Sequence, residues 1–98
     1  MLSNKLTVIT GSNSGIGLGI ARELAKLGSD IVLNSFTDRP EDHDLAAQLA
    51  KEFGTTVRYI SADMSDGDQC RNLIVEAGDV DILVNNAGIQ HEIGRAHV

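Results

Sequence analysis

The chain has 98 residues, which is enough for one small domain but short for a complete doubly wound nucleotide-binding fold. Its formal net charge is -6 and its eight lysines and arginines are dispersed singly, which argues against nucleic acid or an anionic membrane surface as a partner. There is no apolar run long enough to span a bilayer and no signal-peptide pattern at the start, so we expect a cytoplasmic location and no membrane partner.

The first half of the chain predicts a strand, a helix and a second strand. The strand covers residues 5–10 and the helix covers 15–27, where Gly28 follows as a helix-ending glycine. The branched apolar run at 31–33 predicts a second strand at 30–34 that is covered on both faces. The apolar positions expected to form the buried stripe of the helix are Ile16, Ile20, Ala21, Leu24 and Leu27.

The second half repeats this alternation. Pro40 and Gly54 bound a second helix, and a third strand is expected at 56–61, a third helix after it and a fourth strand at 80–84. We therefore predict an α/β chain, the N-terminal part of a doubly wound parallel-sheet Rossmann fold with about four strands and three helices. The expected inward positions are Leu45, Ala46, Leu49, Ala50 and Phe53 in the second helix and Cys70, Leu73, Ile74 and Ala77 in the third, with Cys70 as a buried core thiol.

A glycine-rich run from Thr10 to Gly19 joins the first strand to the first helix. Such a turn aims the free N–H groups of the helix's first turn at one point, where the helix dipole favours a pyrophosphate. We expect Gly11 to make the turn, Gly15 to let the backbone approach a cofactor and Gly17 to let the helix pack closely on the sheet. The spacing is G-x-x-x-G-x-G instead of G-x-G-x-x-G, and a plain glycine-rich helix entry is the alternative.

Two further strand ends carry polar groups at the same edge of the predicted sheet. Asp63 follows the third strand, where a carboxylate can accept a hydrogen bond from an adenine amino group. Its alternative role, the N-cap of the following helix, fits Ser65 better, and Ser65, Asp66 and Asp68 together supply N-cap chemistry there. The run N-N-A-G at 85–88 ends the fourth strand and suits the close approach of a flat ligand. For Asn85, a structural role in tying strand ends together is the alternative.

These three clusters, in this order, resemble the signature of the short-chain dehydrogenase/reductase family. Within that family, the stretches 11–21, 30–36 and 85–91 are similar to enzymes that act on D-3-hydroxybutyrate. The resemblance implies an NAD site with Phe36 near the adenosine, and it assigns Gln90 to the substrate carboxylate. The residues that it implies for the NAD site are Gly11, Asn13, Gly15, Ile16, Gly17, Phe36, Asp63, Met64, Asn86, Ala87 and Gly88.

The end of the second strand departs from the usual NAD pattern. The acid that would hold the ribose 2′-hydroxyl is missing, and Ser35 stands in its place. The preference for NAD therefore rests on the resemblance. Arg39 keeps NADP open because its charge suits a 2′-phosphate, and a solvated Arg39 before Pro40 is the alternative.

The catalytic set of that family is absent from these 98 residues. Its chemistry uses a serine and a tyrosine with a lysine four residues later, whereas Tyr59, the only tyrosine, lies inside the predicted third strand and precedes Asp63 by four residues. His43 and His91 fit a solvent-facing helix position and a loop position, and no metal-ligand spacing accompanies them. We predict no catalytic or metal-binding residue here and no activity of the fragment alone.

The chain ends in a run, Glu92 to Val98, that has no counterpart in that family. It can be encoded by GAG ATC GGA AGA GCA CAC GTC, the start of a widely used sequencing adapter. We interpret residues 93–98 as adapter read-through and expect authentic sequence to stop near His91; a natural polar tail is the alternative. The expected organisation is thus the N-terminal half of an NAD-binding Rossmann domain at 1–91 and a non-native tail at 92–98.

For the parent protein, the resemblance implies hydride transfer between nicotinamide and D-3-hydroxybutyrate or acetoacetate, with a small hydroxy or keto acid as partner and a homotetramer as assembly. An NADPH-linked 3-oxoacyl-carrier-protein reductase shares the first two motifs but is not expected to carry I-Q-H after N-N-A-G. A non-catalytic nucleotide-sensing module is the alternative from another class. Because the fourth strand would be an apolar edge, we expect the 98-residue chain alone to fold poorly and aggregate.

Overall fold

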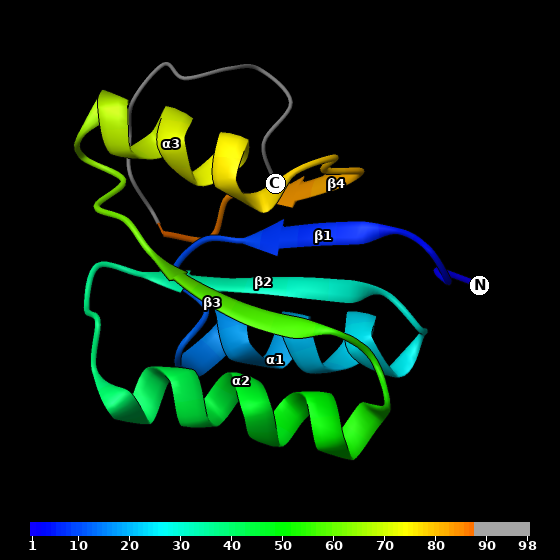
Figure 1. Cartoon of the computed structure of the whole chain (residues 1–98). Coiled ribbons are helices and arrows are strands. Elements are labelled where there is room, and N and C mark those ends of the chain that lie inside the picture. The colour runs from blue at the N-terminus through cyan, green and yellow to red at the C-terminus, as the bar shows by residue number, and fades with distance from the viewer. Residues whose placement is uncertain (88–98) are drawn as a thin grey trace.

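Strands and helices alternate along residues 1–87, the part of the chain that the computed structural model describes (Figure 1). This alternation confirms the predicted α/β class. The strands are β1 (Leu6–Ile9), β2 (Asp30–Ser35), β3 (Val57–Ser61) and β4 (Ile82–Val84), and the helices are α1 (Gly15–Lys26), α2 (Pro40–Phe53) and α3 (Gly67–Ala77).

The strands form one parallel sheet in the order β3-β2-β1-β4. The chain moves outward from β1 to β3 and then returns to place β4 on the other side of β1, so that Val8 pairs with both Val32 and Leu83. The strand order therefore reverses next to β1, which is where doubly wound sheets bind ligands beyond the carboxyl ends of their strands. The predicted site residues all follow those ends.

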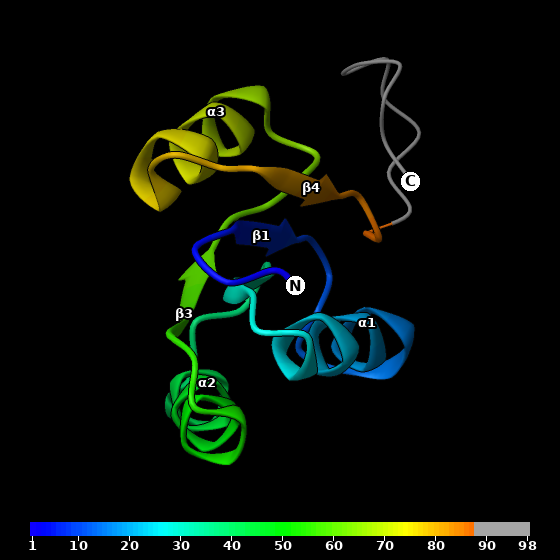
Figure 2. The ribbon, with the colours of Figure 1, turned by 90° about the vertical axis from the view of Figure 1, so that its right-hand side faces the viewer.

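Helices cover both faces of the sheet, with α1 and α2 on one side and α3 on the other (Figure 2). Successive side chains of a strand point to opposite faces, and this alternation builds two cores. Ile9 and Leu33 pack in the core beneath α1 and α2, whereas Val8 and Val32 pack with Leu73 of α3. The buried apolar run of β2 was predicted from its sequence and is explained by this coverage on both faces.

The helix ends agree with the sequence, but one buried face does not. Gly28, two residues after α1, and Gly54, directly after α2, adopt positive φ angles of 100° and 70°, as expected of helix-ending glycines. In α1, however, Ile16 is 77% exposed and the buried residues are Gly17, Ala21 and Ala25. Of the predicted stripe, Ala21 is buried and Ile20 and Leu24 pack against the same core, whereas Ile16 and Leu27 are exposed. The helix approaches the sheet most closely through small residues.

The cap of α3 also corrects the sequence analysis. Asp66, not Ser65, is the N-cap, and its carboxylate accepts hydrogen bonds from the backbone N–H groups of Asp68 and Gln69 at 2.9 and 3.3 Å. The Ser65 hydroxyl instead donates to Asp63 at 2.7 Å. Of the predicted inward positions, Leu73 and Ala77 are buried. Ile74 is 36% exposed because α3 has no partner on that side within residues 1–87.

Cys70 is half-buried, so the prediction of a fully buried thiol was too strong. Its Sγ lies 3.3 Å from the backbone oxygen of Met64, and burial raises the pKa of the thiol. A raised pKa keeps the sulfur protonated and unreactive near neutral pH. No helix within residues 1–87 has both the length and the apolar character needed to cross a membrane.

Candidate functional site

A pocket of about 430 Å³ lies where the carboxyl ends of the strands meet. It joins the glycine-rich turn, the end of β2, the end of β3 and the segment after β4, which the sequence had singled out separately. Its lining residues are Gly11, Asn13, Ser14, Asn34, Ser35, Phe36, Ala62, Asp63, Met64 and Ala87. Six of the predicted cofactor residues are thereby brought together: Gly11, Asn13, Phe36, Asp63, Met64 and Ala87.

The N-terminus of α1 opens without a side-chain cap. Ser14 is its N-cap residue but makes no side-chain capping hydrogen bond, and the first turn carries no acidic residue. In α3, in contrast, the Asp66 side chain caps the first turn, and in α2 the Asp42 side chain accepts a hydrogen bond from the backbone N–H of Arg39. The first N–H groups of a helix need an acceptor from outside the helix, and an anion such as a pyrophosphate is suited to them. At Gly15, which has a φ of 61°, an added Cβ would point into open space, so the backbone there is accessible.

Close backbone packing holds the turn in place beneath this helix end. A Cβ added to Gly17 would lie 2.3 Å from the carbonyl oxygen of Gly11 and 2.9 Å from the Cα of Ser12, distances that no side chain tolerates. Gly11 has a φ of 60°, and its Cβ would lie 3.0 Å from the Cα of Ala87. Gly17 is buried, so the structure places it under the pocket while Gly11 forms part of the wall.

The segment after β4 is tied to the turn through Thr10. The Thr10 hydroxyl accepts hydrogen bonds from the N–H groups of Asn86 and Ala87 at 3.0 and 3.1 Å and donates to the Asn85 carboxamide at 3.1 Å. The Asn86 side chain donates to the Gly11 carbonyl at 3.0 Å. Asn85 therefore has the tying role considered for it, and Asn86 shares that role. The sequence analysis did not assign any function to Thr10.

Asn34 is a second residue that the sequence analysis missed. It is fully buried at the end of β2, and its Nδ2 donates to the carbonyl oxygens of Ile60 and Ala62 at 2.9 and 3.4 Å. Its Oδ1 accepts from the N–H of Gly11 at 3.4 Å, and its backbone exchanges hydrogen bonds with Ser12. One amide thus joins the ends of three strands. The signal available in the sequence was a polar residue directly after the buried apolar run of β2.

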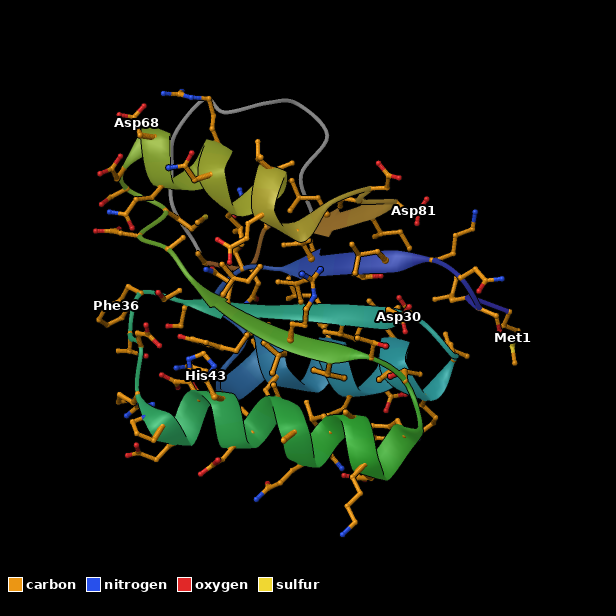
Figure 3. All side chains as sticks on the ribbon, in the orientation of Figure 1. Met1, Asp30, Phe36, His43, Asp68 and Asp81 are labelled. Atoms are coloured by element: carbon orange, nitrogen blue, oxygen red, sulfur yellow. The ribbon has the colours of Figure 1, made fainter. Side chains whose placement is uncertain are left out.

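Two exposed groups stand at the rim of the pocket. Phe36 is 78% exposed and lies at the opposite end of β2 from Asp30 (Figure 3). The Asp63 carboxylate accepts two hydrogen bonds from Ser65, at 2.9 and 2.7 Å, and both end on its Oδ1. These bonds lower the pKa of Asp63 and so favour its ionised form.

A buried carboxylate borders the pocket. Asp42 in α2 is 2% exposed and accepts hydrogen bonds from Asn13 at 3.1 Å, from the Thr37 hydroxyl at 2.8 Å and from the backbone N–H of Arg39 at 3.0 Å. The Arg39 guanidinium lies 3.0 Å from the same carboxylate and, against the opposing effect of burial, holds the pKa of Asp42 well below its usual range. Arg39 is therefore paired and only half-exposed, which differs from a freely solvated side chain.

Tyr59 and His43 occupy structural positions. The Tyr59 hydroxyl donates to the carbonyl of Thr37, and burial raises its pKa above the usual value. The His43 ring packs edge-on against Tyr59 with the ring centres 5.2 Å apart, and it lies 2.6 Å from Asp38 at the surface (Figure 3). Within residues 1–87, no group of acidic, histidine and cysteine side chains is arranged to hold a metal ion.

Several predicted residues lie apart from the lining or outside the described part of the chain. Gly15 and Ile16 are exposed at the start of α1, and Asn86 is not among the residues that line the pocket. Gly88, Gln90 and His91, together with the tail at 92–98, fall outside the residues that the structure describes. The roles expected for them stay predictions.

Comparison with known proteins finds that the chain is similar to one protein family and to several enzymes. A family model described as short chain dehydrogenase matches residues 5–97. The chain is 45% identical to a D-beta-hydroxybutyrate dehydrogenase of Cupriavidus necator over 93% of this chain and 36% of that protein. It is 38% identical to a 3-oxoacyl-acyl-carrier-protein reductase of Rickettsia conorii over 90% of this chain and 34% of that protein. The chain thus spans about a third of the length of the curated relatives it matches.

Solved structures agree with this assignment. L-sorbose reductase from Gluconobacter frateurii, complexed with NADPH and L-sorbose, superposes with a TM-score of 0.80 at 40% identity, over 90% of this chain and 35% of that one. An NADH-dependent reductase complexed with NAD superposes with a TM-score of 0.77 at 33% identity, over 86% of this chain and 36% of that one. These relatives hold different nicotinamide dinucleotides on the same fold. The chain belongs to the short chain dehydrogenase family.

Proposed function

We propose that this chain is the dinucleotide-binding portion of an oxidoreductase that moves a hydride between nicotinamide and a small hydroxy or keto acid. The observation that carries the proposal is the pocket at the strand ends, which lies beside the uncapped N-terminus of α1. A dinucleotide needs an anion site and a flat, partly apolar surface next to it, and both are present there.

Each part of the pocket suits one part of the dinucleotide. The free N–H groups at the start of α1 would hold the pyrophosphate, with Gly11 and Gly15 allowing close approach. The exposed Phe36 ring would pack against the adenosine, and Asp63 would accept a hydrogen bond from the adenine amino group. When bound, the nicotinamide would supply or accept the hydride, while the residues of this chain bind and orient it.

We further propose D-3-hydroxybutyrate and acetoacetate as the substrate pair and NAD as the cofactor. The run N-N-A-G-I-Q-H at 85–91 and the 45% identity to the Cupriavidus enzyme support this choice. Gln90 would bind the substrate carboxylate. A 3-oxoacyl-acyl-carrier-protein reductase is the second candidate, supported by the 38% identity to the Rickettsia enzyme. The cytoplasmic location and the homotetramer stay expectations.

The test is an assay of the full-length protein with both substrate classes. We expect reduction of NAD with D-3-hydroxybutyrate and much weaker oxidation of NADPH with a 3-oxoacyl thioester. The reverse preference would replace the hydroxybutyrate assignment with the second candidate. Binding of NADH without turnover of either substrate would indicate a nucleotide-sensing module instead of an enzyme.

A further inference from the structure

The Asp42 carboxylate connects the two loops that border the dinucleotide pocket. Asn13 belongs to the glycine-rich turn after β1, and Thr37 and Arg39 belong to the loop between β2 and α2. All three donate hydrogen bonds to Asp42, which is buried in the first turn of α2. In dinucleotide-binding folds, the loop after the second strand reads the 2′ position of the adenosine ribose. Asp42 is therefore placed to influence that reading.

The first consequence concerns Asn13, which lines the dinucleotide pocket and also the polar cavity around Asp42. A carboxylate accepts hydrogen bonds only, so the Asn13 carboxamide must present its NH₂ group to Asp42. Its Nδ2 lies 3.1 Å from Asp42 and 3.4 Å from the Thr37 hydroxyl. The carbonyl oxygen is then the atom of this amide left for a ligand. That oxygen accepts from a ribose hydroxyl and repels phosphate oxygens.

The second consequence concerns Arg39, three residues after Phe36. Its Nη2 and Nε lie 3.0 and 3.3 Å from the two oxygens of Asp42, and its backbone N–H also donates to that carboxylate. The positive charge that would suit a 2′-phosphate is thus paired with Asp42, in a side chain that is 54% exposed at the surface. Both consequences act in the same direction, since each removes a group that would favour a phosphate.

We propose that Asp42 is a positioning residue that makes this site prefer a dinucleotide with a free 2′-hydroxyl over one with a 2′-phosphate. The inference rests on the proposed dinucleotide function and explains how a site without the usual acid at the end of β2 can select NAD. The residue acts through Asn13 and Arg39 and needs no contact with the cofactor itself. Asp42 would take the place of the missing acid by orienting the Asn13 amide and pairing with Arg39.

The test compares dissociation constants for NADH and NADPH, measured by calorimetric titration of the full-length protein. The variants are Asp42→Asn, Arg39→Ala and the double variant, with Asp44→Asn as a control because Asp44 is exposed on the same helix. The asparagine keeps the size of the side chain and removes its charge. Thermal unfolding of each variant checks that it is folded.

The wild-type protein should bind NADH more tightly than NADPH. We expect Asp42→Asn to tighten NADPH binding relative to NADH by roughly tenfold, the effect of one charge-assisted hydrogen bond. Arg39→Ala alone should change the ratio by less than about twofold, because its charge is already neutralised. In the double variant the part of the gain that the released Arg39 supplies should disappear and only the part that runs through Asn13 should remain, which a purely structural role of Asp42 would not produce.

An unchanged ratio in a folded Asp42→Asn protein would overturn the inference and leave the dinucleotide function intact. A wild-type protein that binds neither NADH nor NADPH would overturn the function and the inference with it. If Asp42→Asn does not fold, the NADPH affinity of the Arg39→Ala variant tests the inference instead. A roughly tenfold loss of NADPH affinity in that variant would show that Arg39 is free to bind phosphate in the wild-type protein, contrary to the inference.

Discussion

Gly17 and Gly19 stand two residues apart in α1 but have different surroundings. A Cβ at Gly17 would meet the Gly11 carbonyl at 2.3 Å, whereas a Cβ at Gly19 would meet nothing within 4 Å. We predict that Gly17→Ala lowers the free energy of unfolding by about 1 to 3 kcal/mol, because backbone must move to accommodate the methyl group. The matched variant Gly19→Ala should raise it by up to about 1 kcal/mol through helix propensity. Denaturant unfolding of both variants checks this, and equal effects would contradict it.

The lowered pKa of Asp42 implies that the free energy of unfolding falls at acidic pH. The pKa of Asp42 is lowered in the folded protein. Its stabilising contribution is therefore complete above the pKa of the unfolded chain, about 4, and is lost as the pH falls further. We expect Asp42→Asn to lower the free energy of unfolding by about 2 to 4 kcal/mol at neutral pH, with a deficit that is constant from about pH 5 to 8 and shrinks below about pH 4. Unfolding curves at several pH values measure this deficit. A deficit that grew on acidification would contradict the assignment.

At the residue scale, the sequence predicted those positions whose requirement is local. Gly11 and Gly17 are needed by the backbone of one short turn, so their spacing alone identified them. Asn34 and Asp42 were not predicted because each has a partner from a distant segment, Ile60 for Asn34 and Asn13 for Asp42, which only the folded chain brings close. Asp42 stands in a polar run and gives no sign in the sequence that its carboxylate is buried.

At the scale of the element, the cap of α3 can be tested directly. Asp66 accepts two backbone hydrogen bonds at the start of the helix, while Ser65 bonds only to the exposed Asp63. We expect Asp66→Ala to lower the free energy of unfolding by about 1 kcal/mol, the usual value of an N-cap, and Ser65→Ala to cost less than half as much. Chemical denaturation of the two variants distinguishes them. The reverse order would restore Ser65 as the cap.

The elements themselves were predictable because their signals are strong and local. Pro40 and Gly54 mark the two ends of α2, and the apolar run at 31–33 marks β2. The orientation of α1 was predicted less well. Bulky apolar residues usually indicate the buried face of a helix, but this helix packs on the sheet through Gly17, Ala21 and Ala25. Ile16 is consequently exposed next to the candidate anion site.

At the scale of the whole molecule, an apolar surface lies over α3 and β4. Ile74, Val75 and Leu83 are 36, 79 and 41% exposed, and they border an apolar pocket of about 400 Å³. Exposed apolar side chains that lie next to one another favour contact with another protein surface. We predict that the 98-residue chain alone associates with itself as its concentration rises, which sedimentation velocity would detect. A monomer at all concentrations would contradict this prediction.

Leu83 and Leu27 provide a matched pair for that experiment. Both are 41% exposed, but Leu83 lies in β4 beside the apolar pocket and Leu27 lies at the end of α1. Leu83→Glu should shift the chain toward monomer because it places a charge within the patch, and Leu27→Glu should leave the association unchanged. Equal effects of the two substitutions would show that the association does not use this surface.

The parallel sheet and its ligand-binding edge were predicted because alternating strands and helices allow few arrangements. The position of β4 beside β1 was not predicted from the sequence, since the residues of a strand do not specify which strand it pairs with. The pocket followed from that placement, because it brings Ala87 to within contact of the glycine-rich turn. Three separate motifs thereby became one site.

The central claim, that this fold binds a nicotinamide dinucleotide at the start of α1, is tested most directly by calorimetric titration of the full-length protein with NADH. The account predicts saturable binding by the wild-type protein and by Gly19→Ala, and a loss of affinity of at least about tenfold in a folded Gly17→Ala protein. No binding by the wild-type protein, or equal affinity in the two variants, would contradict it.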